Sequence, residues 1–317
     1  GIMISSPAGN DLLFDNASLD QGKFFNNKLW NALKLVKMWE KKVDPSLPVA
    51  DQFATQWFES RLSEVKTEVE KLFAEFRLSE ALKTIYSLIW DDFCSWYLEW
   101  VKPGFDQPIS ADVYNKTVAY FTELLQLLHP YMPFISEEIY HLLEERKEDL
   151  CVKQFTPVAS ANGIRLAEGE LLKQSITALR DARVKNRIKP KDEISLHIET
   201  GNPDKYDNIR SILGRQVNTP TIHIAGTAEK GNISLVIGKD KFYIHSALPA
   251  DHSAQKEQLE KDLAYQKGFL TSIAKKLSNE RFVQNAKPEV VELERKKMTD
   301  AEAKIKAIEE SLAQLVG

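Results

Sequence analysis

Cysteine, glycine and long apolar runs are all scarce in this sequence of 317 residues. The two cysteines, Cys94 and Cys151, lie far apart without the short spacing of a zinc module or a disulfide framework, so we expect a reducing, cytoplasmic compartment. The 13 glycines include neither a GxGxxG nor a GxxxxGKS/T pattern, which excludes the common phosphate-cradling loops. No apolar run approaches the roughly 18 residues that span a bilayer, so we expect no membrane-spanning helix.

The composition is that of a soluble globular protein. Hydrophobic residues make up 43% of the chain and charged residues 28%, and the mean hydropathy is -0.34, which excludes a disordered or collagenous chain. The length favours two or three domains. The sequence begins at Gly1 with no initiator methionine and no leader, which indicates an excised piece of a longer product.

The net charge of -4 hides an asymmetry along the chain. Residues 1–170 carry a net charge of -9, residues 171–251 carry +4 and residues 252–317 carry +1. A sequence pI near 6.0 argues against nucleic acid for the chain as a whole. A local patch can still bind phosphates, because the Debye length at physiological salt is only about 8 Å.

Residues 21–143 have apolar side chains at helical spacing, which predicts a bundle of about four long antiparallel helices. Asp44 and Pro45 end the first helix, Ser110 caps a later one, and the stripe from Leu78 to Trp100 predicts one continuous helix. The tryptophans on these stripes favour core packing over base stacking. They are Trp30, Trp57, Trp96 and Trp100.

Residues 150–249 change to the alternating pattern of strands. Residues 194–198 and 222–224 alternate apolar with polar side chains, and Gly238-Lys239-Asp240 sits between two further runs as a hairpin turn. Helical patterns at 169–186 and 204–213 precede and separate these strands. The region therefore predicts a small α+β domain.

The last 65 residues predict an antiparallel two-helix coiled coil, or arm. Two heptad seams flank a turn that contains Pro288, and folding back at the turn pairs them in one register. The alternative is a parallel coil between two chains. The expected pairs are Leu259 with Leu315, Leu263 with Leu312, Gln266 with Ile308, Leu270 with Ile305, Ile273 with Ala301, and Leu277 with Met298.

No catalytic or metal-binding constellation emerges from the sequence. The six histidines show neither HExxH nor HxxxH spacing, so we expect structural or surface roles for them. Asp91 and Asp92 are neighbours that a solvated helix face explains, and no GxSxG pattern suggests a nucleophile. The histidines are His129, His141, His197, His223, His245 and His252.

Two basic clusters are the candidate contacts to nucleic acid. In the first, Arg180, Arg183 and Arg187 would line one helical stripe and grip phosphate oxygens, although Ile176 on that stripe indicates that part of it turns inward. A solvated face is the alternative for both clusters. The first cluster comprises Arg180, Arg183, Lys185, Arg187, Lys189 and Lys191, and the second, near the arm's turn, Lys275, Lys276, Arg281 and Lys287.

Four segments resemble a known family. Residues 5–15 (SSPAGNDLLFD), 22–40, 76–103 and 127–140 (LLHPYMPFISEEIY) are similar to the anticodon-binding helical domain of class I aminoacyl-tRNA synthetases. LSNERFVQNAKPEVVELER at 277–295 looks specifically like the valyl-tRNA synthetases. The resemblance implies four parts: a connector from a missing catalytic core at 1–18, an anticodon-binding bundle at 19–148, the α+β domain at 149–250 and a tRNA-binding arm at 251–317.

The resemblance also implies a division of labour. The bundle would recognise the anticodon stem-loop of tRNA(Val), with Asn26, Asn27 and Lys28 as candidate contacts, and the arm would lean on the outer corner of the tRNA. The parent enzyme would use ATP and Mg²⁺ to join valine to tRNA. The HIGH and KMSKS signatures are absent here, so we expect this chain to hold no cofactor and to be inactive alone.

Two other classes of function stay open on the residues alone. One is a protein-protein adaptor that uses the bundle and the coil to hold helical partners. The other is a standalone enzyme. A self-paired arm removes one reason to dimerise, so we expect a monomer that binds neither DNA nor membrane.

Overall fold

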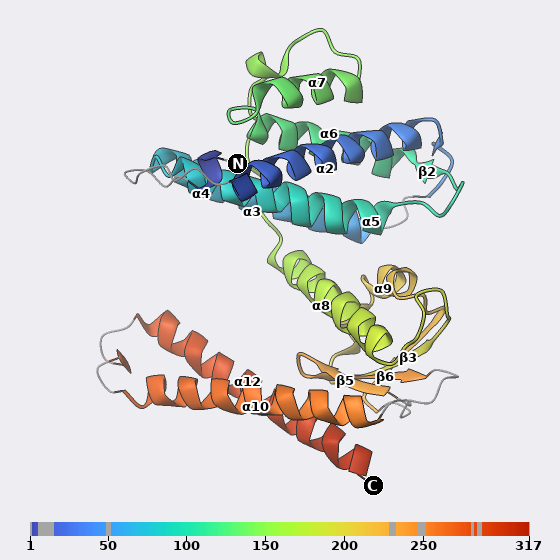
Figure 1. Cartoon of the computed structure of the whole chain (residues 1–317), viewed down its shortest axis with the longest axis vertical. Coiled ribbons are helices and arrows are strands. Elements are labelled where there is room, and N and C mark those ends of the chain that lie inside the picture. Colours follow the sequence, from blue (N-terminus) through green and yellow to red (C-terminus); the bar gives the residue numbers. More distant parts are fainter. Residues whose placement is uncertain are drawn as a thin grey trace. The chain divides into compact units, whose positions relative to one another are not determined.

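The structure is a computed structural model that describes residues 2–5, 16–48, 52–227, 233–245, 252–279, 282–283 and 287–316. The chain divides into two compact units, residues 1–169 and 170–317 (Figure 1). The finer four-part division expected from the sequence stays a prediction. Among the residues described, no helix is both long and apolar enough to cross a bilayer.

Unit 1 is a helical bundle, as the apolar stripes predict. Leu29, Val36, Phe58 and Val65 of these stripes are fully buried, and Ser110 accepts a hydrogen bond from Val113 N–H as the expected helix cap. Two short strands, β1 (Val43–Asp44) and β2 (Ile109–Ser110), pair in parallel. The helices are α1 (Ile2–Ser5), α2 (Asn16–Glu40), α3 (Gln52–Ala74), α4 (Leu78–Ser87), α5 (Leu98–Val101), α6 (Ala111–Leu128) and α7 (Pro133–Leu143), followed by a 3-10 turn, η2 (Leu150–Val152).

The chain is helical from Leu78 to Val101 without a break, as the apolar stripe predicts, but its middle part is not α-helical. Between α4 and α5 lies a π-helical segment, η1 (Leu88–Tyr97), in which one turn holds more residues than an α-helical turn. The wider turn buries Leu88 and Phe93, five positions apart, and it brings Asp92 inside. Asp92 is therefore not on a solvated face, because its carboxylate accepts a hydrogen bond from Arg61 Nε at 2.8 Å.

The long helix α8 (Gly163–Lys185) begins in unit 1 and continues into unit 2. At Gly169 its backbone packs directly on the indole ring of Trp57, so closely that a Cβ atom there would lie 2.1 Å from the ring. Trp57 itself is 1% exposed, and its ring centre lies 4.5 Å from that of Trp100, with the two rings tilted by 54°. Glycine at position 169 is required for this close approach.

Unit 2 is built on a mixed four-stranded sheet in the order β4-β3-β6-β5. The parallel pair β3–β4 is joined by a crossover that contains η3 (Pro203–Tyr206) and α9 (Arg210–Gln216), and β5–β6 is the hairpin that the sequence predicts, with Gly238 at φ +61° in its turn. The strands are β3 (Ser195–Glu199), β4 (Thr221–Ala225), β5 (Ile233–Ile237) and β6 (Asp240–His245).

One face of the sheet forms the core of unit 2. Leu196 and Ile198 of β3 are fully buried, as are Ile176 and Leu179 of α8, which runs alongside the sheet in Figure 1. The inward turn of the α8 stripe at Ile176 is therefore observed. The alternate side chains of β3 lie on the opposite face and are half-buried.

The arm consists of two helices, α10 (His252–Leu277) and α12 (Pro288–Val316), which lie against each other and run in opposite directions (Figure 1). Lys267 forms an ion pair with Glu309 at 2.7 Å, one residue along each helix from the expected pair of Gln266 and Ile308. The antiparallel hairpin is thus confirmed. The side chain of Leu315 lies outside the described residues, so its pairing with Leu259 stays a prediction.

The base of the arm is fixed to the β5–β6 hairpin by two ion pairs. Lys239 of the hairpin turn pairs with Asp300 of α12 at 2.6 Å, and Lys241 of β6 pairs with Glu310. Ala307, Ile308 and Ser311 of α12 are buried. The sheet therefore anchors the C-terminal half of α12, and the C-terminal end of α10 and the N-terminal end of α12 extend beyond these contacts.

Candidate nucleic-acid interface

The first basic cluster spans the end of α8 and the loop that follows it. The helix ends at Lys185, and Arg187 has a left-handed backbone with φ +57°. Ile188 N–H donates to the Arg183 carbonyl at 2.9 Å and Arg187 N–H donates to the Val184 carbonyl at 3.1 Å, which is the Schellman arrangement of a helix end. Arg187 is therefore not on a helical stripe with Arg180 and Arg183, contrary to the sequence expectation.

Arg183 is the second departure from that expectation, because its side chain is only 4% exposed. Its guanidinium donates to the Val217 carbonyl at 2.8 Å and to the carbonyls of Lys189, Pro190 and Asp192. Burial lowers the pKa of Arg183 from its ordinary value. A guanidinium enclosed by carbonyl oxygens cannot reach an RNA phosphate, so we withdraw Arg183 from the candidate contacts.

The remaining members of the first cluster are exposed. Arg180 donates to the Gln216 side chain at 2.8 Å, and the side chain of Lys185 lines a cavity described below. Arg187, Lys189 and Lys191 lie on the loop of residues 187–191, which we name the basic loop. All five residues are exposed within one short segment.

The backbone of the basic loop is held from several sides. Besides the bonds from Arg183 to the Lys189 and Pro190 carbonyls, the Asp192 carboxylate accepts the N–H of Lys189 at 3.1 Å, and Asn218 donates to the Lys191 carbonyl at 2.8 Å. A loop fixed in this way presents its cations without first having to be ordered, which lowers the entropic cost of binding.

The second cluster lies near the end of the arm. Lys275, Lys276 and Lys287 are exposed, while Arg281 lies outside the described residues. Lys276 approaches Glu294 at 3.9 Å, and the hydrogen bond from Lys297 lowers the pKa of the Glu294 carboxyl. The charge here is mixed, so the arm offers isolated cations and not a continuous basic face.

The three candidate contacts on α2 differ in accessibility. Asn27 is exposed. Lys28 is engaged within the bundle, where its Nζ donates to Ser95 at 2.7 Å and lies 4.1 Å from the centre of the Trp90 ring. The side-chain oxygen of Asn26 is buried without a hydrogen-bond partner among the described residues, in a cavity that Phe25 and Tyr86 also line.

Exposed phenylalanines in unit 1 are a feature that the sequence analysis missed. Phe105 is fully exposed in the loop before β2, Phe134 is 90% exposed at the start of α7, and Phe24 on α2 is 57% exposed. An exposed aromatic ring is a surface on which an unpaired base can stack. In the sequence, the Pro103-Gly104 pair before Phe105 indicates that this ring is exposed, because the pair predicts a surface turn whose side chains do not reach the core.

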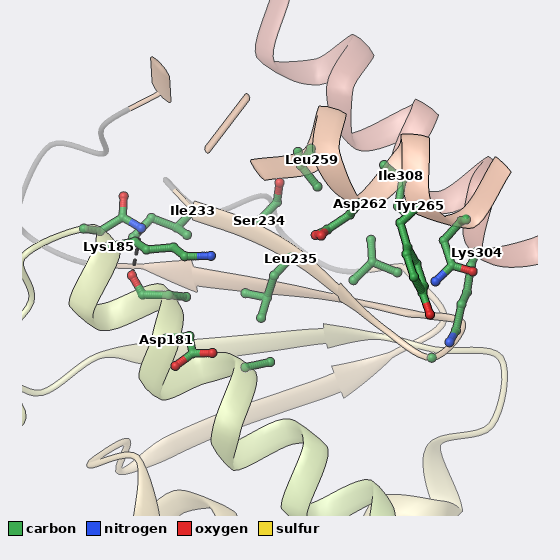
Figure 2. Close-up of a pocket in the computed structure, with 16 residues that line it drawn as sticks. Asp181, Lys185, Ile233, Ser234, Leu235, Leu259, Asp262, Tyr265, Lys304 and Ile308 are labelled. Atoms are coloured by element: carbon green, nitrogen blue, oxygen red, sulfur yellow. Dashed lines mark hydrogen bonds between the residues drawn. The ribbon is translucent and has the colours of Figure 1, made fainter. Parts of the chain in front are cut away.

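Figure 2 shows a cavity of about 310 Å³ in unit 2, between α8, β5 and the arm. Lys185 and Asp181 of α8 face Asp262 of α10 and Lys304 of α12 across a floor that includes Leu235. Two cations and two anions cancel, so the cavity favours neither phosphate nor a metal ion. We assign no ligand to it.

Two known families match the chain. Residues 55–199 match the anticodon-binding domain of tRNA ligase, and residues 251–316 match the valyl tRNA synthetase tRNA binding arm. The first match includes α3 to β3, and the second covers α10 and α12.

Curated relatives align with the chain over 99% of its length. The chain is 42% identical to a valine–tRNA ligase of Phocaeicola vulgatus and 40% identical to one of Parabacteroides distasonis, and it covers 36% of each. A valine–tRNA ligase of Agrobacterium fabrum is 28% identical, with 34% of it covered. The chain thus spans about a third of the length of these relatives.

Proposed function

This chain belongs to the valyl-tRNA synthetase family, as the portion that carries the anticodon-binding domain and the tRNA-binding arm, and we propose that it holds tRNA(Val) at two separate places. In this proposal the bundle binds the anticodon stem-loop, and the arm binds the outer corner of the tRNA. The chain acts as a monomer in the cytoplasm and serves a parent enzyme that joins valine to this tRNA.

The observation that carries the proposal is the basic loop, held by Arg183, in the same unit as the arm. Phosphate contacts supply most of the affinity for RNA, and they need cations that the fold presents to solvent. Arg187, Lys189 and Lys191 meet this need in a chain whose first 170 residues carry a net charge of -9. Unit 2 would therefore supply most of the electrostatic attraction.

Specificity is assigned to unit 1. Anticodon bases are unstacked in a single-stranded loop, where side chains can reach their edges and rings can stack on them. Asn27 is the one exposed member of the α2 candidates, and Phe24 lies nearly one helical turn before it on the same helix. We propose this part of α2 as an anticodon contact.

The chemistry of aminoacylation is assigned to the rest of the parent protein. ATP and Mg²⁺ need a phosphate-binding loop and the HIGH and KMSKS signatures, and none of these patterns occurs in the sequence. The residues of this chain therefore do not fit either group. We expect no exchange of pyrophosphate into ATP when the chain is supplied with valine.

A binding titration tests the proposal. The chain is titrated with tRNA(Val), with the same tRNA carrying a changed anticodon, and with an unrelated tRNA, each at two salt concentrations. We expect a preference for the unchanged anticodon and an affinity that falls steeply with salt, with a slope of roughly -0.7 to -0.9 per phosphate contact. A protein-protein adaptor would show neither the preference nor the steep slope.

A further inference from the structure

A cluster of two histidines and two carboxylates lies at the C-terminal end of the bundle, far along the sequence from the basic loop. Glu137 and His141 are one turn apart on α7, Asp149 comes from the segment that leads to η2, and His129 directly follows α6. Three separate segments supply these groups, so their spacing in the sequence resembles no metal motif.

The donor atoms of three of these residues converge. His141 Nε2 lies 3.2 Å from Glu137 Oε1 and 3.2 Å from Asp149 Oδ1, and the donor atoms of all three lie within 4.8 Å of one another. Ligand atoms bound tetrahedrally to zinc at about 2.0–2.1 Å lie about 3.3 Å apart. The two distances from His141 match the edges of such a tetrahedron.

His129 lies next to Glu137. Its Nε2 atom is 3.8 Å from Glu137 Oε2, and its Nδ1 atom is 2.8 Å from the Ser136 hydroxyl, which donates to the Met132 carbonyl. His129 is not among the residues whose donor atoms converge within 4.8 Å, so it lies beside the site and not in it.

Two carboxylates flank one imidazole ring in this cluster. Glu137 Oε1 also accepts Leu150 N–H at 2.6 Å, which helps to orient that carboxylate. One nitrogen and two oxygen donors from α7 and the segment after it thus meet at one point.

We propose that His141, Glu137 and Asp149 bind a divalent transition-metal ion, zinc by the chemistry of its donors, with water in the fourth position. Mixed nitrogen and oxygen ligands in a tetrahedral arrangement favour zinc over magnesium or calcium. The cavity of about 350 Å³ that His129, Glu137 and His141 line is open to solvent and gives the ion a path of entry.

The ion would fasten residues 144–150 to α7. Asp149 is exposed, and in this region the chain leaves the bundle for the segment that leads to α8. The Leu150 N–H bond to Glu137 is one existing link, and a shared metal ion would add a second through Asp149. The site is independent of tRNA binding and does not rest on the proposed function.

Metal titration of the whole chain tests the proposal. After removal of metals with a chelator, Zn²⁺ uptake is followed by calorimetry and Co²⁺ uptake by the visible absorption of a tetrahedral complex. We expect one equivalent to bind, and His141→Ala and Asp149→Asn to weaken binding at least about 100-fold. Zinc should also raise the melting temperature of the unsubstituted chain and not that of Asp149→Asn.

A matched control comes from the histidines on the sheet. His197 lies between His223 and His245, with ring centres 4.6 and 4.4 Å away, and such a row can take up metal nonspecifically. His223→Ala should leave the equivalent unchanged. No uptake by the chain, or uptake that His223→Ala removes and Asp149→Asn does not, would overturn the proposal. Asp149 is exposed, so its variant is expected to fold.

Discussion

Arg183 donates a hydrogen bond to the carbonyl oxygen of Val217 at 2.8 Å, across 34 residues of sequence. The same guanidinium holds the carbonyls of Lys189 and Asp192, so one buried cation ties the basic loop to the end of α9. The most conspicuous arginine of the basic cluster thus has a structural role. Arg183 is buried, whereas Arg187, Lys189 and Lys191 on the loop that it holds are exposed.

Arg183→Lys is expected to destabilise unit 2 by about 2–4 kcal/mol. A lysine ammonium cannot satisfy four carbonyls in a planar fork, and each buried acceptor that loses its partner costs about 1–3 kcal/mol. Urea unfolding followed by circular dichroism measures the change. Arg180→Lys, at an exposed position of the same helix, is the control and should change stability by less than about 0.5 kcal/mol. Equal effects of the two substitutions would contradict the role given to Arg183.

Replacing Arg187, Lys189 and Lys191 together with alanine is expected to weaken tRNA binding and to leave the fold intact. Each lost phosphate contact lowers the magnitude of the salt slope by about 0.7–0.9, so three contacts would lower it by about 2. Binding measured at several salt concentrations gives both quantities. The double variant Lys189→Arg/Lys191→Arg keeps the charge and should keep the slope. An unchanged slope in the triple variant would remove the basic loop from the interface.

Gly169→Ala is expected to destabilise unit 1 by about 1–3 kcal/mol, although alanine is the better helix former. The added Cβ would lie 2.1 Å from the Trp57 ring, which is buried and cannot move away without disturbing Trp100. Gly163→Ala is the matched control on the same helix, because no atom lies within 4 Å of the Cβ it would add. Thermal unfolding of both variants makes the comparison, and a loss of stability in the control alone would refute the close packing.

The ion pair between Lys241 and Glu310 is expected to weaken in acid. The hydrogen bond from Lys241 lowers the pKa of the Glu310 carboxyl below its ordinary value of 4.5, so the pair contributes its full stability above pH 4.5. That contribution is lost as the pH falls through the lowered pKa of the folded state.

Melting temperatures of the unsubstituted chain and of Glu310→Gln, measured from pH 6 to pH 3, test this expectation. The difference between them should be constant above pH 4.5 and should vanish at lower pH. Glu302→Gln, at an exposed position on the same helix, is the control for the loss of a surface carboxylate. A difference that grows in acid would have the wrong sign for a lowered pKa.

The sequence predicted those parts of the fold that depend on local spacing. Apolar stripes located the helices, the Gly238-Lys239-Asp240 turn located the β5–β6 hairpin, and the heptads of the arm predicted its antiparallel pairing. These features need only neighbours a few residues apart, so periodicity is sufficient to find them.

Features that depend on distant partners were missed. Asp92 became buried because the π-helical segment shifts it inward toward Arg61, and periodicity with a fixed 3.6-residue repeat has no place for such a shift. Arg183 was read as a surface cation because the carbonyl of Val217 that it binds lies 34 residues away. A count of cations along the chain does not reveal which of them form hydrogen bonds with backbone carbonyls inside the fold.

The seam of the arm is narrow. The small side chain of Ala301 is buried in it, while Leu263 and Leu270 on the opposite helix are only half-buried. Two helices that pack only on each other bury little apolar surface, so the stability of the pair depends on further contacts at either end. The sheet braces one end through Lys239 and Lys241. The rate of backbone amide hydrogen exchange in the arm should therefore increase with distance from the sheet. A tRNA bound at the far end would make that end more ordered.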